Sequence, residues 1–222
     1  MNVIENNIVF PIKLSLEVST ISVAIVFLTS ILMAKAMART RFKGKLLVET
    51  LLMLPLVLPP TVIGFLLIIL FGPHSPIGSL VERIFQHSLM FTSWAAVMAA
   101  SVVSFPLMYQ SVKSGFQSVD GEVEEAARVD GANEWHVFLF VTLPLSVKAV
   151  VTGMILSFSR ALGEFGATLM FAGNIPQKTQ TAPSAIYIAM DSGNMETAWI
   201  LVISMIAISS LMLFATNLIK QK

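Results

Sequence analysis

The stretch Glu125-Ala126-Ala127-Arg128-Val129-Asp130-Gly131, followed by Val141-Thr142-Leu143-Pro144, decides how the rest of the chain is interpreted. It is a polar segment in a very apolar chain, because 55% of the 222 residues are hydrophobic and only 12% are charged. Soluble domains contain about 45–50% apolar and about 25% charged residues. The mean hydropathy of +0.81 agrees with this contrast. We therefore expect a membrane protein with one prominent polar loop.

Five segments are long and apolar enough to cross a membrane as helices, which takes about 20 residues each. They are roughly residues 11–37, 46–71, 89–112, 145–172 and 198–219. The segments are continuously apolar and lack the alternation of barrel strands, so the predicted fold is an all-α polytopic membrane protein. Residues 1–222 are expected to form a single transmembrane domain. Residues 184–190 are apolar but too few to span, and are expected to be interfacial or re-entrant.

The basic residues indicate the orientation of these spans. With five spans, ten lysines and arginines fall on the side of residues 118–144, three fall on the other side, and Arg160 lies within a span. Basic residues concentrate in cytoplasmic loops of membrane proteins. The polar loop (residues 118–144) and the C-terminus are therefore expected in the cytoplasm, and the N-terminus outside.

The polar loop contains the signals of two short helices. Asp120 can cap the first helix, Gly131 can end it in a left-handed conformation, and Asn133 can cap the second. Val123, Ala126 and Ala127 share one narrow face of small side chains, which allows another protein to approach closely. The alternative is an amphipathic helix that packs back on its own bundle.

The spacing of this loop matches E-A-A-x-x-x-G-x₉-I-x-L-P, with Val141 at the isoleucine position. It resembles the loop by which inner-membrane permeases of ABC importers dock onto their cytoplasmic ATPases. Residues 54–60, 104–107, 160–168 and 174–176 look like the corresponding stretches of molybdate permeases. Sulfate and tungstate permeases share the Gly-Glu-Phe-Gly type of motif, so all three oxyanions remain open.

The resemblance implies a type I ABC-importer permease fold, with the coupling loop between spans three and four. It also implies a homodimer in a prokaryotic cytoplasmic membrane, two ABC ATPase subunits and an external solute-binding protein. Such a permease alternates access with ATP hydrolysed by its partners. The residues expected to couple the chain to the ATPase are Glu125, Ala126, Ala127, Gly131, Leu143 and Pro144.

A second group of residues is expected inside the membrane, as parts of the translocation pathway. Its members are Arg160, Gly163, Glu164, Gly166, Pro59 and Pro60. Arg160 and Glu164 are four residues apart, so they can pair on one helix face. The pair either lines the pathway as a partly neutralised cation or is a structural ion pair. The glycines indicate close helix packing or a hinge, and the prolines indicate a kink or a broken span beside the pathway.

The sequence also lacks several motifs. There is no phosphate-binding G-x₄-G-K-[ST] and no G-x-S-x-G or H-E-x-x-H, so we expect no enzyme activity in this chain. The chain has no cysteines and three scattered histidines, so we expect no metal site. We also expect no bound cofactor and no nucleic acid partner, whereas membrane lipid is an expected partner. The alternatives of another class are an ion-gradient-driven secondary transporter, which often has inverted repeats, and an intramembrane enzyme.

Overall fold

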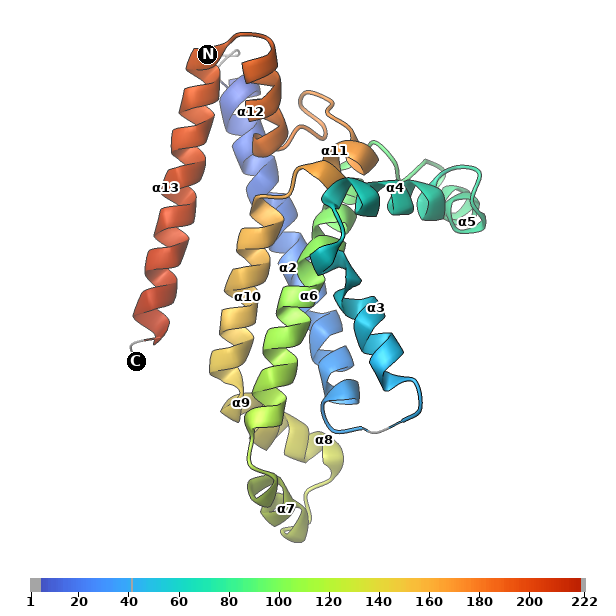
Figure 1. The fold of residues 1–222 in the computed structure, drawn as a ribbon, viewed down its shortest axis with the longest axis vertical. Helices are drawn as coiled ribbons and strands as arrows, with labels where there is room; N and C mark the ends of the chain where they lie inside the picture. The colour runs from blue at the N-terminus through green and yellow to red at the C-terminus, as the bar shows by residue number, and fades with distance from the viewer. Residues whose placement is uncertain (1–4, 41, 221–222) are drawn as a thin grey trace.

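Three long helices define the long axis of the molecule (Figure 1): α2 (Phe10–Ala38), α6 (Ser93–Ser118) and α13 (Met195–Lys220). The computed structural model describes residues 5–40 and 42–220, and every regular element in this part is helical. Arg41 and Lys222, which entered the count of basic residues, lie outside the described residues. The predicted all-α architecture is confirmed.

The number of spans depends on how two bent helix pairs are counted. Within the described residues, three helices are long and apolar enough to cross alone, namely Asn7–Ala38, Ser93–Ser118 and Met195–Phe214. The number rises to five if each bent pair forms one span. The third span was expected at residues 89–112, but α6 begins four residues later and ends six residues later. Its start is determined by Thr92, whose side chain accepts a hydrogen bond from the backbone of Ala95.

The expected second span, residues 46–71, is broken at Pro59 and Pro60, which were predicted to cause a kink or a broken span. It is divided into α3 (Lys45–Val57) and α4 (Pro60–Phe71), whose axes differ by 117°. Leu58 and Pro59 are extended, and prolines 59 and 60 have no N–H to continue the helical hydrogen bonds. As a result α4 lies across the bundle, together with the unpredicted helix α5 (Pro76–Phe85) (Figure 1).

The expected fourth span, residues 145–172, is also interrupted. Helix α10 (Val147–Leu162) ends before Gly163, and the short helix α11 (Gly166–Ala172) starts after a three-residue break. Pro144 does not begin α10 directly, because it lies in the three-residue helix α9 (Leu143–Leu145), and the chain bends by 70° between the segments Glu134–Leu145 and Val147–Leu162.

Helices α2, α6 and α10 pack against one another to form the core of the bundle. Helix α6 contributes a row of small residues that are all completely buried, namely Ala95, Ala96, Ala99, Ala100 and Ser104. Glycines allow α10 equally close contact, since a Cβ on Gly153 would lie 2.8 Å from the Met108 sulfur. Close approach of backbones at small residues is the usual basis of packing between membrane helices.

Two elements complete the bundle at its edges. Helix α12 (Ala182–Asp191) has ten residues and packs against α13 and α2 at the end opposite the polar loop (Figure 1). Only 11% of the 18-residue apolar stretch of α13 that could cross a membrane is buried within the chain. An apolar helix left so uncovered needs lipid or another protein around it.

Candidate functional site

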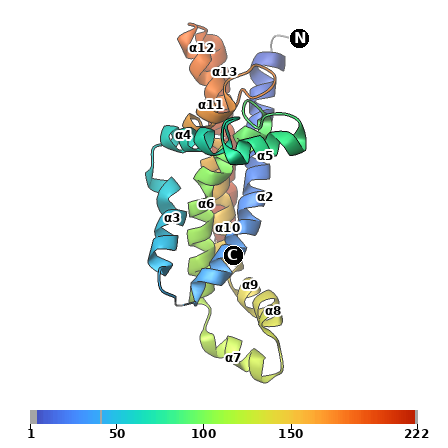
Figure 2. The ribbon, with the colours of Figure 1, turned by 90° about the vertical axis from the view of Figure 1, so that its right-hand side faces the viewer.

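The polar loop forms a separate unit at one end of the bundle (Figure 2). It contains α7 (Gly121–Val129), α8 (Glu134–Val137) and the π-helical turn η2 (Phe138–Thr142). The Asp120 carboxylate accepts a hydrogen bond from the backbone N–H of Glu122 at 3.0 Å. The side-chain carbonyl of Asn133 accepts hydrogen bonds from the backbone N–H groups of Trp135 and His136. Gly131 has a φ of 92°, as predicted for the residue that ends the first helix. Both predicted caps and the left-handed glycine are therefore present.

The outward surface of this loop is uncovered and carries both acidic and apolar side chains. Glu125 and Ala126 are exposed, Ala127 is half-buried, and Val129 keeps 87% of its surface. Further large apolar side chains that are exposed in the loop are Val123, Trp135, Leu139 and Phe140. Of the narrow face of small residues, Val123 and Ala126 are thus accessible to another protein, whereas Ala127 is partly covered.

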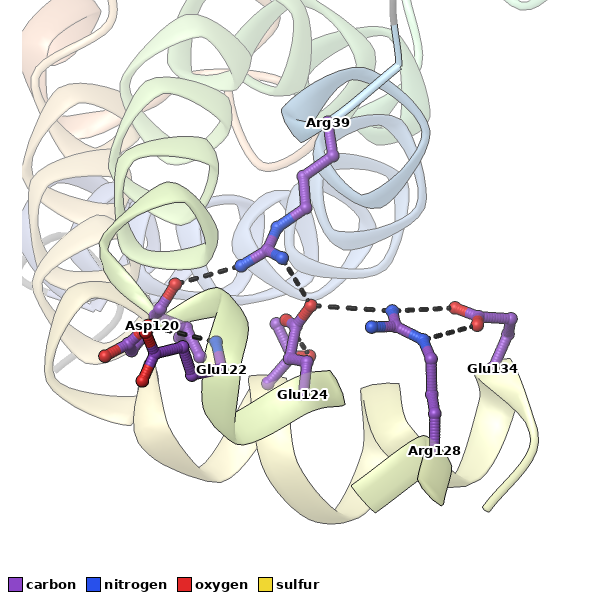
Figure 3. Close-up of polar contacts among 8 residues, drawn as sticks. Arg39, Asp120, Glu122, Glu124, Arg128 and Glu134 are labelled. Carbon is purple, nitrogen blue, oxygen red and sulfur yellow. Dashed lines mark hydrogen bonds and ion pairs between the residues drawn. The ribbon is translucent and has the colours of Figure 1, made fainter. Parts of the chain in front are cut away.

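Glu124 lies on the inward side of α7 and is only 3% exposed. Its carboxylate lies 2.6 Å from a guanidinium nitrogen of Arg39, at the end of α2, and accepts a hydrogen bond from the Thr142 hydroxyl at 2.7 Å (Figure 3). Arg128, one turn further along α7, approaches the same carboxylate at 3.6 Å. A buried carboxylate needs such partners to remain charged.

The ion pairs continue outward from Glu124. Arg128 donates two hydrogen bonds to the Glu134 carboxylate, at 2.7 and 3.2 Å, and so joins α7 to α8 (Figure 3). These hydrogen bonds lower the pKa of Glu134 and raise the pKa of Arg128. We call Arg39, Glu124, Arg128, Glu134 and Thr142 the Glu124 cluster.

A second attachment lies one helical turn before Arg39. The ammonium group of Lys35 lies 3.3 Å from the centroid of the Trp135 ring and 4.3 Å from that of Phe138, which is a cation–π arrangement. Phe138 is buried and meets Phe116 of α6 edge-on. The end of α2 therefore holds both halves of the polar loop, one through Arg39 and the other through Lys35.

The residues expected inside the membrane gather where α10 is broken. Arg160 donates a hydrogen bond to Glu164 at 2.7 Å, so the predicted pair forms, although the helix ends at Leu162 and the two do not share one helix face. The other carboxylate oxygen of Glu164 accepts from the backbone of Ala167 at 2.8 Å, at the start of α11. Glu164 is buried, whereas the Arg160 side chain is 31% exposed.

The two glycines at this break have different surroundings. A Cβ on Gly166 would lie 3.1 Å from the Cβ of Pro60, so Gly166 is a packing residue that brings α11 against the start of α4. A Cβ on Gly163 would meet nothing closer than 3.6 Å, and Gly163 marks the end of α10. The prediction of packing therefore holds at Gly166, and the alternative of a break holds at Gly163. Pro59 and Pro60 form the neighbouring break between α3 and α4.

The two groups of residues lie far apart. Helix α10 has 16 residues, which correspond to about 24 Å at 1.5 Å per residue, and it separates the polar loop from the Arg160 pair. Leu143 and Pro144, the last residues of the predicted coupling set, lie at the loop end of this helix.

Comparison with known proteins assigns this architecture to a family. The family model described as binding-protein-dependent transport system inner membrane component matches residues 26–222. The chain belongs to this family. It is therefore an inner-membrane component of a transport system, and its helices make it a multi-pass membrane protein.

Two relatives resemble this chain in sequence, and one solved structure shares its fold. This family member is 54% identical to a putative molybdenum transport system permease protein, YvgM, of Bacillus subtilis (strain 168), over 92% of this chain and 90% of the relative. It is 33% identical to the sulfate transport system permease protein CysT of Escherichia coli (strain K12), over 86% of this chain and 69% of the relative. A chain of a bacterial alginate ABC transporter, solved in complex with alginate pentasaccharide-bound periplasmic protein, matches with a TM-score of 0.74 at 18% identity, covering 94% of this chain and 76% of that chain. The predicted type I ABC-importer permease fold is confirmed.

Sequence reasoning missed the Glu124 cluster in this family member. Neither Glu124 nor Arg39 is among the residues that the sequence predicted for the site. The spacing of Glu124 and Arg128 is a local signal for an ion pair. Arg39, however, is 85 residues away along the chain, and nothing in the local pattern indicates that contact.

Proposed function

We propose that this permease imports a tetrahedral oxyanion, molybdate, with energy from ATP hydrolysed by partner subunits. The relative named as a molybdenum permease is 54% identical, whereas the relative named as a sulfate permease is 33% identical. This difference favours molybdate over sulfate, and tungstate shares the same shape and charge. Membership in a binding-protein-dependent family also favours this function over an ion-gradient-driven transporter or an intramembrane enzyme.

The observation that carries the proposal is the outward face of the polar loop. It presents Val123, Ala126 and Val129 uncovered, while the inward face is fixed to the bundle by Arg39 and Lys35. An exposed apolar patch on a firmly held support is typical of a protein interaction site. We assign this face, with Glu125 and Gly131, to the docking of a cytoplasmic ABC ATPase. The chain itself then needs no cofactor and no ATP site.

The proposed assembly contains two copies of this chain, two ATPase subunits and an external solute-binding protein. The apolar surface of α13 that its own chain leaves uncovered is consistent with a second subunit and lipid. The basic residues favour a cytoplasmic polar loop and C-terminus, with the N-terminus outside. The related alginate transporter was solved with a periplasmic protein bound.

For the translocation pathway we propose the break between α10 and α11. The Arg160 guanidinium is partly exposed and partly neutralised by Glu164, which is a suitable balance for an anion that must be released after it is attracted. Gly163 ends the helix beside it, and the neighbouring contact of Gly166 with Pro60 holds the two broken helices together. Pro59 directly precedes Pro60, at the start of α4.

The test is reconstitution of the chain with its ATPase and binding protein in proteoliposomes. ATPase co-purification and stimulation of hydrolysis by the loaded binding protein are expected, with molybdate uptake stronger than sulfate uptake. Tungstate is the third arm, since it distinguishes a molybdate-selective system from one that selects by size and charge alone. A permease that purifies without any ATPase and imports anions without ATP contradicts the proposal.

A further inference from the structure

We propose that Glu124 is a positioning residue for energy coupling, because through Arg39 it makes helix α2 move together with the polar loop. The inference rests on the proposed function, since it requires that an ATPase acts on this loop. It concerns the inward face of α7, whereas the docking assignment concerns the outward face.

The first argument is connectivity. The polar loop is covalently continuous with α6 on one side and with α9 and α10 on the other. Helix α2 has no such link, because its end at Ala38 continues into residues 39–44 and then α3. Among the described residues, Arg39 reaches the loop by two contacts: its guanidinium pairs with Glu124 at 2.6 Å and donates a hydrogen bond to the Val119 carbonyl at 2.9 Å.

The second argument is the number of segments that meet at one carboxylate. Glu124 contacts the end of α2 through Arg39, its own helix through Arg128, and the π-helical turn η2 through Thr142. Hydrogen bonds and ion pairs at these distances have preferred directions. They fix the orientation of the three segments, whereas apolar contacts alone permit sliding.

The third argument is the course of α2 itself. It is an uninterrupted helix of 29 residues, which span about 43 Å at 1.5 Å per residue. Near its other end, the Ser15 hydroxyl accepts a hydrogen bond from the backbone of Ala182 at 2.7 Å, which joins α2 to α12. Helix α10, by contrast, is bent at one end and broken at the other. A displacement of the loop can therefore reach the opposite end of the bundle along α2 without passing a break.

The experiment uses the complete complex in proteoliposomes and measures three quantities for each variant: ATPase co-purification, ATP hydrolysis, and molybdate imported per ATP hydrolysed. The variants are E124Q, R39Q and the double variant R39Q/E124Q. Because Arg39 is partly exposed, R39Q is the milder change and remains informative if E124Q assembles poorly. E122Q, an exposed glutamate on the same helix, and K43Q, an exposed lysine just beyond Arg39, are the matched controls.

We expect E124Q and R39Q to keep their ATPase and to hydrolyse ATP, while the molybdate imported per ATP falls about tenfold, within the usual range of coupling between distant sites. The double variant should be no worse than R39Q, because R39Q already removes the ion pair with Glu124, together with the hydrogen bond from Arg39 to Val119. The controls should keep the wild-type ratio.

Two results overturn the inference. One is a normal amount of molybdate per ATP in E124Q and R39Q complexes, even at reduced yield, which leaves the cluster a purely stabilising role. The other is loss of the ATPase from these variants alone, which means that the cluster shapes the docking surface itself. If the wild-type chain binds no ATPase, the proposed function fails, and the outcome is distinguishable from both.

Discussion

The contact between the two short crossing helices, α4 and α11, gives a sharp test of the fold. At Gly64 of α4, an added Cβ would lie 2.6 Å from the Cβ of Met170 and 3.1 Å from the Cα of Ala167. Carbon atoms in contact are about 3.5–4.0 Å apart, so Gly64→Val forces α4 and α11 apart by roughly 1 Å. Overpacking of this kind costs about 1–3 kcal/mol, and the backbone contact at Ala167 favours the upper part of that range.

The expected effect can be measured as thermal stability of the purified complex in detergent. For a chain of this size, each kcal/mol shifts the unfolding temperature by about 2–4 °C, so a loss of about 2–3 kcal/mol lowers it by about 4–12 °C. Gly163→Val is the matched control, because its nearest neighbour is 3.6 Å away and exposed substitutions usually stay within about 0.5 kcal/mol. Equal stability of the two variants would refute the close α4–α11 contact and, with it, the 117° turn.

Three other predictions concern the loop, the orientation and the Arg160 pair. Glu125→Lys and Gly131→Val, the latter at a backbone φ of 92°, should leave the bundle folded but reduce ATPase co-purification or uncouple ATP hydrolysis from transport. Transport at the wild-type rate in both variants contradicts the docking assignment. A cysteine at Gly44 should react with impermeant reagents only from the cytoplasmic side, and one at Gln177 only from outside, so labelling of both from one side contradicts the proposed orientation. Glu164→Gln and Arg160→Gln should each slow anion uptake by tenfold or more in complexes that still assemble. A tenfold change corresponds to a change in activation free energy on the order of 1.4 kcal/mol. Full transport by the double variant excludes Arg160 from the pathway.

The local features of the polar loop could be predicted from the sequence. The caps at Asp120 and Asn133 and the left-handed Gly131 each depend on residues within three positions of one another, so the pattern contains all the information. The long apolar helices could be predicted for the same reason, since hydropathy over about 20 residues is a local property.

The angles at the breaks and the long-range contacts could not be predicted in the same way. The prolines and glycines indicate where a span can bend, but an apolar run that continues through a bend has the same hydropathy as a straight span. The 117° turn between α3 and α4 and the end of α10 at Leu162 were therefore not predicted. The turn at Pro59 is directed by packing at Gly64 and Gly166 against a segment about 100 residues away. The role of Glu124 depends on Arg39, and the role of Glu164 depends on the end of α10 before Gly163.

Glu124 and Glu164 show the same arrangement at two levels of the molecule. Each carboxylate is nearly inaccessible, each pairs with an arginine, and each accepts a further hydrogen bond, from Thr142 or from the backbone of Ala167. Burying a charge in this way adds little net stability compared with apolar packing, so stability alone does not explain either site. Both sites join separate helical segments: Glu124 joins the end of α2 to the polar loop, and Glu164 lies in the break between α10 and α11. Directional bonds keep the geometry of such a junction when the segments move, which apolar contacts do not do. The described part of the chain thus combines continuous helices with polar junctions, which is the arrangement that the proposed role of Glu124 in coupling requires.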